Sequence, residues 1–266
     1  DKKSEAVDLM RLVLHEPNFD SSILEREKKR YIASINQGKT MPSSIASKAF
    51  MKALYGKHPY GLPSSGEVES IKKIRKKDLH TFYKNHYLSN ELSIVIVGDV
   101  SRKNAEDLGN KISLGFSERK INAEIPSVDY VKGQEIEISH PAKQAHLYYG
   151  APIIKRGDPD FLTLYLGNYI LGGGGFVSRL TQEIREDRGL AYSVYSYFMP
   201  FIEAGPFQIG IQTKKSQVKQ AKELIQKTVA DFIKNGPTSN ELRRAKDFMI
   251  GGFPLRLDSN KKILEY

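Results

Sequence analysis

Arg185 and Tyr192 stand seven residues apart and are the pair in this 266-residue chain best suited to chemistry. A guanidinium can hold carbonyl oxygens without consuming a proton, and a phenol can donate a hydrogen bond to an oxyanion. The residues between them predict a tight corner, with a helix that ends at Gly189 and a strand that starts at Leu190. That corner would bring the two side chains together. Alternatively, Arg185 pairs only with Glu183 or another nearby acid, and Tyr192 is an ordinary sheet aromatic.

A run of four glycines precedes this corner. Because no Cβ restricts φ, the run predicts a sharp turn whose backbone approaches other parts of the chain closely. A short helix should follow, with Ser178 as its N-cap and with Leu180 and Ile184 on its apolar face. The run is not a phosphate-binding loop, because neither a following Lys-Ser/Thr nor G-x-G-x-x-G is present. We interpret it as a substrate-side loop or hinge formed by Gly172, Gly173, Gly174 and Gly175.

Composition narrows the class of protein. The chain has no cysteine, which excludes disulfides and thiolate metal ligands. No apolar run approaches the roughly 18 residues that cross a bilayer. We therefore expect no transmembrane segment. The absence of thiols fits an oxidising compartment, so we expect a periplasmic or otherwise exported protein, with a cytoplasmic one as the alternative. The chain begins at Asp1 without an initiator Met, so we expect that an upstream part has been removed.

The net charge of +10 favours an anionic partner such as an acidic protein. The basic residues are densest around 72–77, where isoleucines and a leucine recur at helical spacing. This cluster is therefore interpreted as the solvent-exposed face of an amphipathic helix. Aromatic residues are not interleaved with it, and no nucleic-acid-binding motif is present. We expect no nucleic-acid partner. The cluster consists of Lys72, Lys73, Arg75, Lys76 and Lys77.

Hydrophobic periodicity predicts helices and strands in mixed order, which favours an α+β sandwich over a doubly wound sheet. A Ser22–Glu25 capping box is expected to open the second helix. The predicted strands cover residues 92–97, 135–139, 145–150 and 207–212, together with the segment from Leu190. The predicted helices cover residues 5–15, 22–37, 45–54, 67–87, 105–112, 161–171, 217–234 and 239–250.

Several motifs together resemble the pitrilysin/insulinase group of metallopeptidases, the inverted zincins, which include mitochondrial processing peptidase. They are R-E-D-R-G-L-A-Y with its upstream glycines and S-R-L, and, earlier in the chain, Y-G-K-H-P-Y-G, D-L-H-T-F-Y-K-N-H-Y and I-V-I-V-G-D-V. The resemblance runs from about Phe19 to Gly252. It implies an α+β fold of two related α/β sandwich halves, both truncated here. It divides the chain into residues 1–120, a linker at 121–131, and residues 132–266, which carry Arg185 and Tyr192.

The zinc signature of that family, H-x-x-E-H, is absent from this sequence. The remaining zinc ligand of active relatives is a glutamate late in a helix, and the matching position here is Ser34. A neutral hydroxyl is a poor replacement for a carboxylate on zinc. Glu27 lies two turns earlier, about 10 Å away by helical rise, and is too far to replace it. His58, His80, His86, His140 and His146 are scattered along the chain, so no metal site is expected in it.

The resemblance therefore implies a divided catalytic site. In that arrangement a partner subunit carries H-x-x-E-H and zinc, and this chain supplies Arg185 to the substrate backbone and Tyr192 to the oxyanion. We expect a heterodimer that degrades peptides, with the substrate bound as an extended strand. In one alternative, this is a fragment of an active zinc endopeptidase whose H-x-x-E-H lies upstream. In another, it is a scaffold or binding member of the family without proteolysis.

Overall fold

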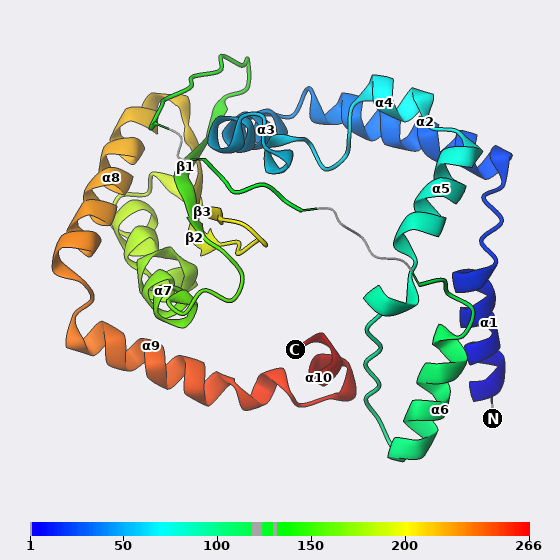
Figure 1. Cartoon of the computed structure of the whole chain (residues 1–266). Helices are drawn as coiled ribbons and strands as arrows, with labels where there is room; N and C mark the ends of the chain where they lie inside the picture. The colour runs from blue at the N-terminus through cyan, green and yellow to red at the C-terminus, as the bar shows by residue number, and fades with distance from the viewer. Residues whose placement is uncertain (1, 119–123, 130–131) are drawn as a thin grey trace. The chain divides into compact units, whose positions relative to one another are not determined.

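The computed structural model describes residues 2–118, 124–129 and 132–266 (Figure 1). The chain forms two compact units, each assembled from separate stretches of sequence. The first comprises residues 1–33, 67–123 and 251–266, and the second comprises residues 34–66 and 124–250. The domain limits expected from sequence remain a prediction, and residues 121–123 and 130–131 of the expected linker lie outside the described residues.

The first unit is helical where it is described. Its helices are joined by polar contacts to the backbone: the Tyr83 hydroxyl donates to the Leu14 carbonyl at 2.7 Å, and the His15 ring contacts the Ile112 carbonyl at 2.8 Å. These contacts tie the first helix to two others. The helices are α1 (Lys3–His15), α2 (Ser21–Gly38, which continues into the second unit), α4 (Val68–Lys73), α5 (Lys76–His86), α6 (Arg102–Ser113) and α10 (Asn260–Glu265).

The second unit contains a three-stranded antiparallel sheet in the order β1-β3-β2. The strands are β1 (Gln144–Ile154), β2 (Ala191–Phe198) and β3 (Gly205–Lys214). The helices of this unit are α3 (Pro42–Tyr55), α7 (Phe161–Asn168), α8 (Val218–Asn235) and α9 (Ser239–Gly252). Mixed helices and a small antiparallel sheet confirm the predicted α+β class.

The hydrophobic core lies on one face of this sheet. Ile209 and Ile211 of β3 and Val194 of β2 pack with Ala221 and Ile225 of α8. Alternation along the strands sends these residues to one face because successive side chains of a strand point to opposite sides. The core is completed by Leu171, Leu180, Ile184 and Leu190 from the segment that carries the glycine run and the corner.

The other face of the sheet carries tyrosines. Tyr148 of β1 and Tyr195 of β2 both stand opposite Gly210 of β3. A Cβ on Gly210 would lie 2.8 Å from Cε2 of Tyr195, so this glycine leaves the room that the ring occupies. Burial raises the pKa of Tyr148 to about 12. The rings of Tyr148 and Tyr195 thus lie over Gly210 of the middle strand, where a side chain would clash with Tyr195.

Two predicted strands are wrong. The structure gives no strand at residues 92–97 or 135–139. A strand requires hydrogen bonds to a neighbouring strand, and neither segment has such a ladder within the described residues. Val95 is 65% exposed, so the apolar run of residues 92–97 is not the buried central strand that its composition suggests.

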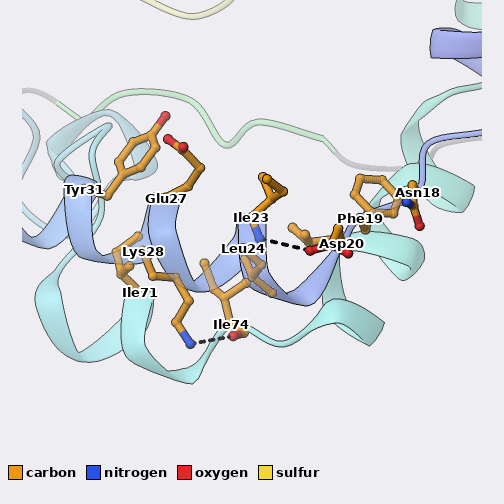
Figure 2. A pocket seen from close by; sticks show the side chains of 11 residues that line it. Asn18, Phe19, Asp20, Ile23, Leu24, Glu27, Lys28, Tyr31, Ile71 and Ile74 are labelled. Carbon is orange, nitrogen blue, oxygen red and sulfur yellow. Dashed lines mark hydrogen bonds between the residues drawn. The ribbon is translucent and has the colours of Figure 1, made fainter.

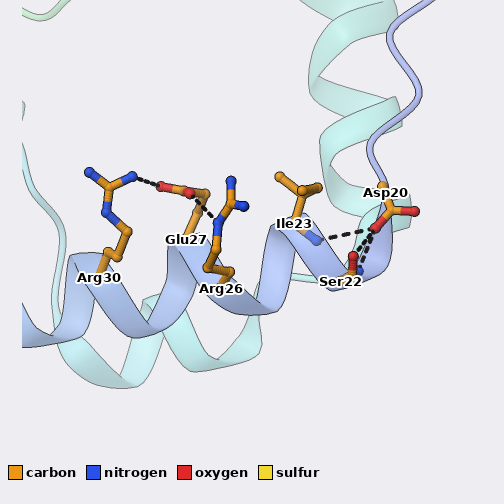
Figure 3. A network of polar contacts seen from close by, with 6 residues as sticks. All are labelled: Asp20, Ser22, Ile23, Arg26, Glu27 and Arg30. Atoms are coloured by element: carbon orange, nitrogen blue, oxygen red, sulfur yellow. Dashed lines mark hydrogen bonds and ion pairs between the residues drawn. The ribbon is translucent and has the colours of Figure 1, made fainter.

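The start of α2 also differs from the prediction (Figure 3). The backbone N–H groups of Ser22 and Ile23 donate to Asp20 Oδ1 at 2.7 and 3.2 Å, so Asp20 caps the helix and the Ser22–Glu25 box does not form. An aspartate is as good a cap as serine and stands one residue before the helix. These hydrogen bonds, with one from the Ser22 hydroxyl, lower the pKa of Asp20.

The predicted helix at residues 67–87 is divided into α4 and α5 by an extended backbone at Ile74 and Arg75. The basic residues of this region are exposed while Ile71, Ile74 and Leu79 are partly buried, which confirms the amphipathic interpretation. None of the helices in the described part of the chain has the length and the apolar content of a membrane span.

Candidate functional site

The corner between Arg185 and Tyr192 is closed by backbone hydrogen bonds. Arg185 lies in a π-helical turn, Thr181–Glu186, in place of the expected α-helix. Gly189 has φ +60° and donates its N–H to the Arg185 carbonyl at 2.9 Å, and Leu190 N–H donates to the Ile184 carbonyl at 2.9 Å. The left-handed conformation is favourable for glycine, which confirms the predicted helix end. Turns of the π type are frequent at functional sites.

Tyr192 is placed by an irregularity of the sheet. Ala191 pairs with Thr213 and Ser193 pairs with Gln212, so Tyr192 is an extra residue in β2 with no partner of its own in β3. Such a bulge bends the strand and redirects a side chain. Tyr192 is 83% exposed, so its phenol is free of the core.

Arg185 lies against two aromatic rings and also forms an ion pair with a neighbouring acid. Its Cζ atom lies 4.5 Å from the ring centre of Phe176 and 5.5 Å from that of Tyr192. Its ion pair with Glu186 is long, at 3.4 Å, and Glu183 is paired with Arg188 at 2.7 Å instead. The corner therefore brings Arg185 and Tyr192 together as predicted. Of the alternative pairings, the one with Glu183 is not formed, whereas Arg185 does pair with another nearby acid, Glu186. Sequence reasoning missed Phe176, which directly follows the glycine run.

At each position of the run, a side chain would either clash with neighbouring atoms or strain the backbone. A Cβ on Gly172 would lie 2.8 Å from Leu180 Cδ1 and closer still to the Ser196 hydroxyl. Gly173 and Gly174 would meet Asn168 Nδ2 and the Tyr169 carbonyl, each at 2.6 Å. Gly175 has open space but φ +60°. The run thus packs closely against other segments of the same chain and turns sharply, as predicted. Its role as a substrate-side loop or hinge stays a prediction.

The helix that leads into the run is tied, through Asn168 at its end, to the strand that carries Tyr192. The Ser196 hydroxyl donates to Asn168 Oδ1 at 2.6 Å, and Asn168 Nδ2 donates to the Ser196 carbonyl at 3.1 Å. Both residues are buried. At the other end of the run, the Ser178 hydroxyl donates to the Gly175 carbonyl at 2.7 Å. Ser178, which was expected to cap the following helix, therefore hydrogen-bonds to the preceding run and stabilises the turn that contains Phe176.

A salt bridge between Arg179 and Glu241 links the segment just before the π-helical turn to α9. Arg179 forms two hydrogen bonds with Glu241, Nε to Oε1 and a terminal nitrogen to Oε2, both at 2.7 Å. Hydrogen bonding from Arg179 lowers the pKa of Glu241 to about 2, and the same bond raises the pKa of Arg179. Thr238 adds a capping box with Glu241 at the start of α9. This brace was also missed, because its two halves are 62 residues apart.

The first unit contains an apolar groove of about 610 Å³ between α2 and the α4–α5 segment (Figure 2). Figure 2 shows Ile23, Glu27 and Tyr31 projecting from the same side of α2. Glu27 is bonded to Arg26 and Arg30, at 3.0 and 2.9 Å, which lowers its pKa (Figure 3). The groove is lined by Asn18, Phe19, Asp20, Ile23, Leu24, Glu27, Lys28, Tyr31, Ile71, Ile74 and Leu79.

The position expected for a zinc ligand, Ser34, does not suit zinc. Ser34 is exposed on α2, seven residues beyond Glu27, and it offers only a neutral hydroxyl. In the part of the chain that the structure describes, no three His, Asp or Glu side chains gather as a metal site. Arg185 and Tyr192 offer a permanent positive charge and hydrogen-bond donors.

Comparison with known proteins identifies the family. The family model described as "Peptidase M16 inactive domain" matches residues 73–249. This chain belongs to the peptidase M16 inactive-domain family. The resemblance inferred from the motifs is thereby confirmed.

Relatives of this inactive-domain chain carry differing names. It is 30% identical over 254 residues to "Uncharacterized zinc protease YmxG" of Bacillus subtilis and 33% identical over 258 residues to "Non-peptidase homolog YmxG" of Helicobacter pylori. Each alignment covers 96% of this chain, but only 61% and 59% of those relatives. The chain thus spans about three fifths of the length of these proteins.

A solved structure supports the same assignment. A peptidase M16 inactive domain from Pseudomonas fluorescens is 37% identical, with a TM-score of 0.95 over 100% of this chain and 63% of that chain. A protease from Helicobacter pylori shares the fold, with a TM-score of 0.83 at 18% identity.

Proposed function

We propose that this chain is the non-catalytic part of a two-subunit zinc peptidase and that it contributes Arg185 and Tyr192 to a shared site. The partner would carry H-x-x-E-H and bind the zinc, which activates water and polarises the peptide carbonyl. The observation that carries the proposal is the adjacency of the Arg185 guanidinium and the exposed Tyr192 ring, 5.5 Å apart at one closed corner. Family membership supports it.

The roles of the two side chains follow from their chemistry. The phenol of Tyr192 would donate a hydrogen bond to the oxyanion that forms on the scissile carbonyl, where a well-placed donor contributes most. Arg185 would hold carbonyl oxygens of the substrate backbone with its N–H groups. An extended peptide presents such carbonyls at regular intervals, so the expected substrate is an unfolded peptide.

The test is a reconstitution of the full-length protein with a zinc subunit that carries H-x-x-E-H, assayed with an internally quenched peptide. Tyr192→Phe should lower kcat by about 10²-fold, the usual effect of losing an oxyanion donor. Tyr149→Phe is the matched control, because Tyr149 is a partly exposed tyrosine on β1 of the same sheet. Unchanged cleavage by Tyr192→Phe and Arg185→Ala would refute the shared site and favour a scaffold or binding protein.

A protein that carries H-x-x-E-H upstream of this segment is the alternative that the names of its zinc-protease relatives favour. Metal analysis of the full-length protein distinguishes the two. The divided-site proposal expects no stoichiometric zinc in this subunit purified alone. One tightly bound zinc per chain would contradict it.

The charge of the partner is a further expectation. A net charge of +10 on this chain favours docking to an acidic subunit, because complementary potentials accelerate association. The association rate of the pair should therefore fall as ionic strength rises. A salt-independent rate would count against electrostatic docking.

A further inference from the structure

The three arginines around the corner use their guanidinium groups in different ways. Arg179 makes two hydrogen bonds of 2.7 Å to Glu241. Arg188 donates at 2.7 Å to both the carboxylate and the backbone carbonyl of Glu183. Arg185 lies against two aromatic rings, and among the described residues its ion pair is with Glu186, at 3.4 Å.

From this contrast we infer that Phe176 is a positioning residue for Arg185. The inference rests on the proposed function, because it concerns the same shared site. The Phe176 ring is the nearer of the two, at 4.5 Å from Cζ, while Tyr192 is at 5.5 Å. A ring holds a guanidinium through its face and accepts no strong hydrogen bond from it. The terminal N–H donors of Arg185 therefore remain available for carbonyl oxygens of a bound peptide, while Nε faces Glu186.

The backbone explains how Phe176 reaches Arg185. Gly175 has φ +60°, a conformation that glycine adopts without strain, and it turns the chain directly before the phenylalanine. The Ser178 hydroxyl then holds the Gly175 carbonyl at 2.7 Å. Phe176 is 64% exposed, so packing in the core does not account for a large apolar side chain at this position.

This geometry gives the glycine run a specific task. It places one aromatic ring beside the guanidinium while Tyr192, fixed by the bulge in β2, supplies the other. Arg179 and Arg188 pair with carboxylates at 2.7 Å, whereas the pair between Arg185 and Glu186 is longer, at 3.4 Å. The two rings therefore hold Arg185 ready for substrate and keep it from a short carboxylate pair.

Substitution of Phe176 in the full-length protein, reconstituted with its zinc subunit, tests the inference. Phe176→Leu keeps an apolar side chain of similar size but removes the ring. It should lower kcat/KM for a quenched peptide by about 2- to 5-fold, mainly through KM, which corresponds to an exposed cation–π contact of roughly 0.5–1 kcal/mol. Phe176→Tyr should retain activity. Val177→Ala, at the neighbouring 60% exposed position, is the control and should have no effect.

A double-mutant cycle separates positioning from general damage. In an Arg185→Gln background, Phe176→Leu should cause no additional loss, because the cation it holds is gone. A second readout needs no activity: in the NMR spectrum of the protein alone, the Nε–Hε resonance of Arg185 should shift in Phe176→Leu and stay in place in Val177→Ala.

The outcomes distinguish this inference from the proposed function. If Arg185→Gln lowers activity but Phe176→Leu behaves like Val177→Ala, Phe176 does not position Arg185 and the inference is overturned. Equal losses in Phe176→Leu and Phe176→Tyr, or additive losses with Arg185→Gln, would overturn it as well. If Arg185→Gln has no effect, the shared site itself fails, while the NMR shift still reports whether the ring holds the guanidinium.

Discussion

The guanidinium carbon of Arg185 lies 5.5 Å from the centre of the Tyr192 ring, although a π-helical turn, a left-handed glycine and a strand bulge separate the two residues along the chain. The arrangement depends on local backbone geometry, because Gly189 closes the helix end and the unpaired position in β2 turns Tyr192 away from the core. Local elements thus determine the distance between two side chains that are exposed to solvent in part or almost fully.

Arg185→Lys should lower kcat/KM of the reconstituted pair nearly as much as Arg185→Ala. Lysine keeps the charge but loses the planar group that stacks on rings and presents several donors. Steady-state kinetics with a quenched peptide measure the effect. Arg188→Lys is the control, since Arg188 is paired with Glu183 and should tolerate the change. Full activity of Arg185→Lys would show that only charge is needed at this position.

Two glycines of the run should respond to alanine for different reasons. Gly172→Ala places a methyl group against Ser196 and Leu180 in the core and should cost about 1–3 kcal/mol of unfolding free energy. Gly175→Ala meets no atom but carries the left-handed penalty of about 1–2 kcal/mol. Denaturant unfolding measures both. As control, Gly109→Ala in α6, where the methyl group also meets no atom, should be neutral or stabilising.

For peptide cleavage, in contrast to stability, Gly175→Ala should have a larger effect than Gly172→Ala. Gly175→Ala disturbs the turn that presents Phe176, so its kcat/KM should fall even under conditions where the protein is fully folded. Activity that simply follows the folded fraction of Gly175→Ala would mean that the turn matters only for stability.

Gly210→Ala should destabilise the sheet by about 1–3 kcal/mol, because the new Cβ would overlap the Tyr195 ring. Removing that ring tests the cause. In a Tyr195→Ala background the same glycine substitution should cost little, and chemical denaturation of the four proteins gives the coupling energy. Additive effects would place the strain elsewhere in β3.

Acid should remove the contribution of the Arg179–Glu241 bridge. The folded pKa of Glu241, about 2, lies below its ordinary value of 4.5, so the bridge stabilises fully above the ordinary value and is lost as pH falls towards 2. Glu241→Gln should cost about 1–3 kcal/mol at neutral pH, between the ranges for exposed and buried pairs. The difference between the two proteins in denaturant unfolding should shrink steadily below the ordinary pKa. A difference that is constant with pH would contradict this assignment.

The sequence alone determined the parts that depend on short-range patterns. Helical periodicity located most helices to within a few residues, because an amphipathic helix needs only its own backbone bonds and one apolar face. The exceptions are the break at Ile74 and Arg75 and the short α10, which was not predicted. Gly189 and the glycine run predicted the corner, because left-handed and close-packed backbone positions require glycine. The tertiary structure decided which extended segments became strands, since residues 92–97 have strand-like composition but no described partner. It also decided that the Phe176 ring lies beside Arg185 and that Glu241 pairs with Arg179. Neither contact follows from a local pattern, and the second joins side chains 62 residues apart, which only packing brings together.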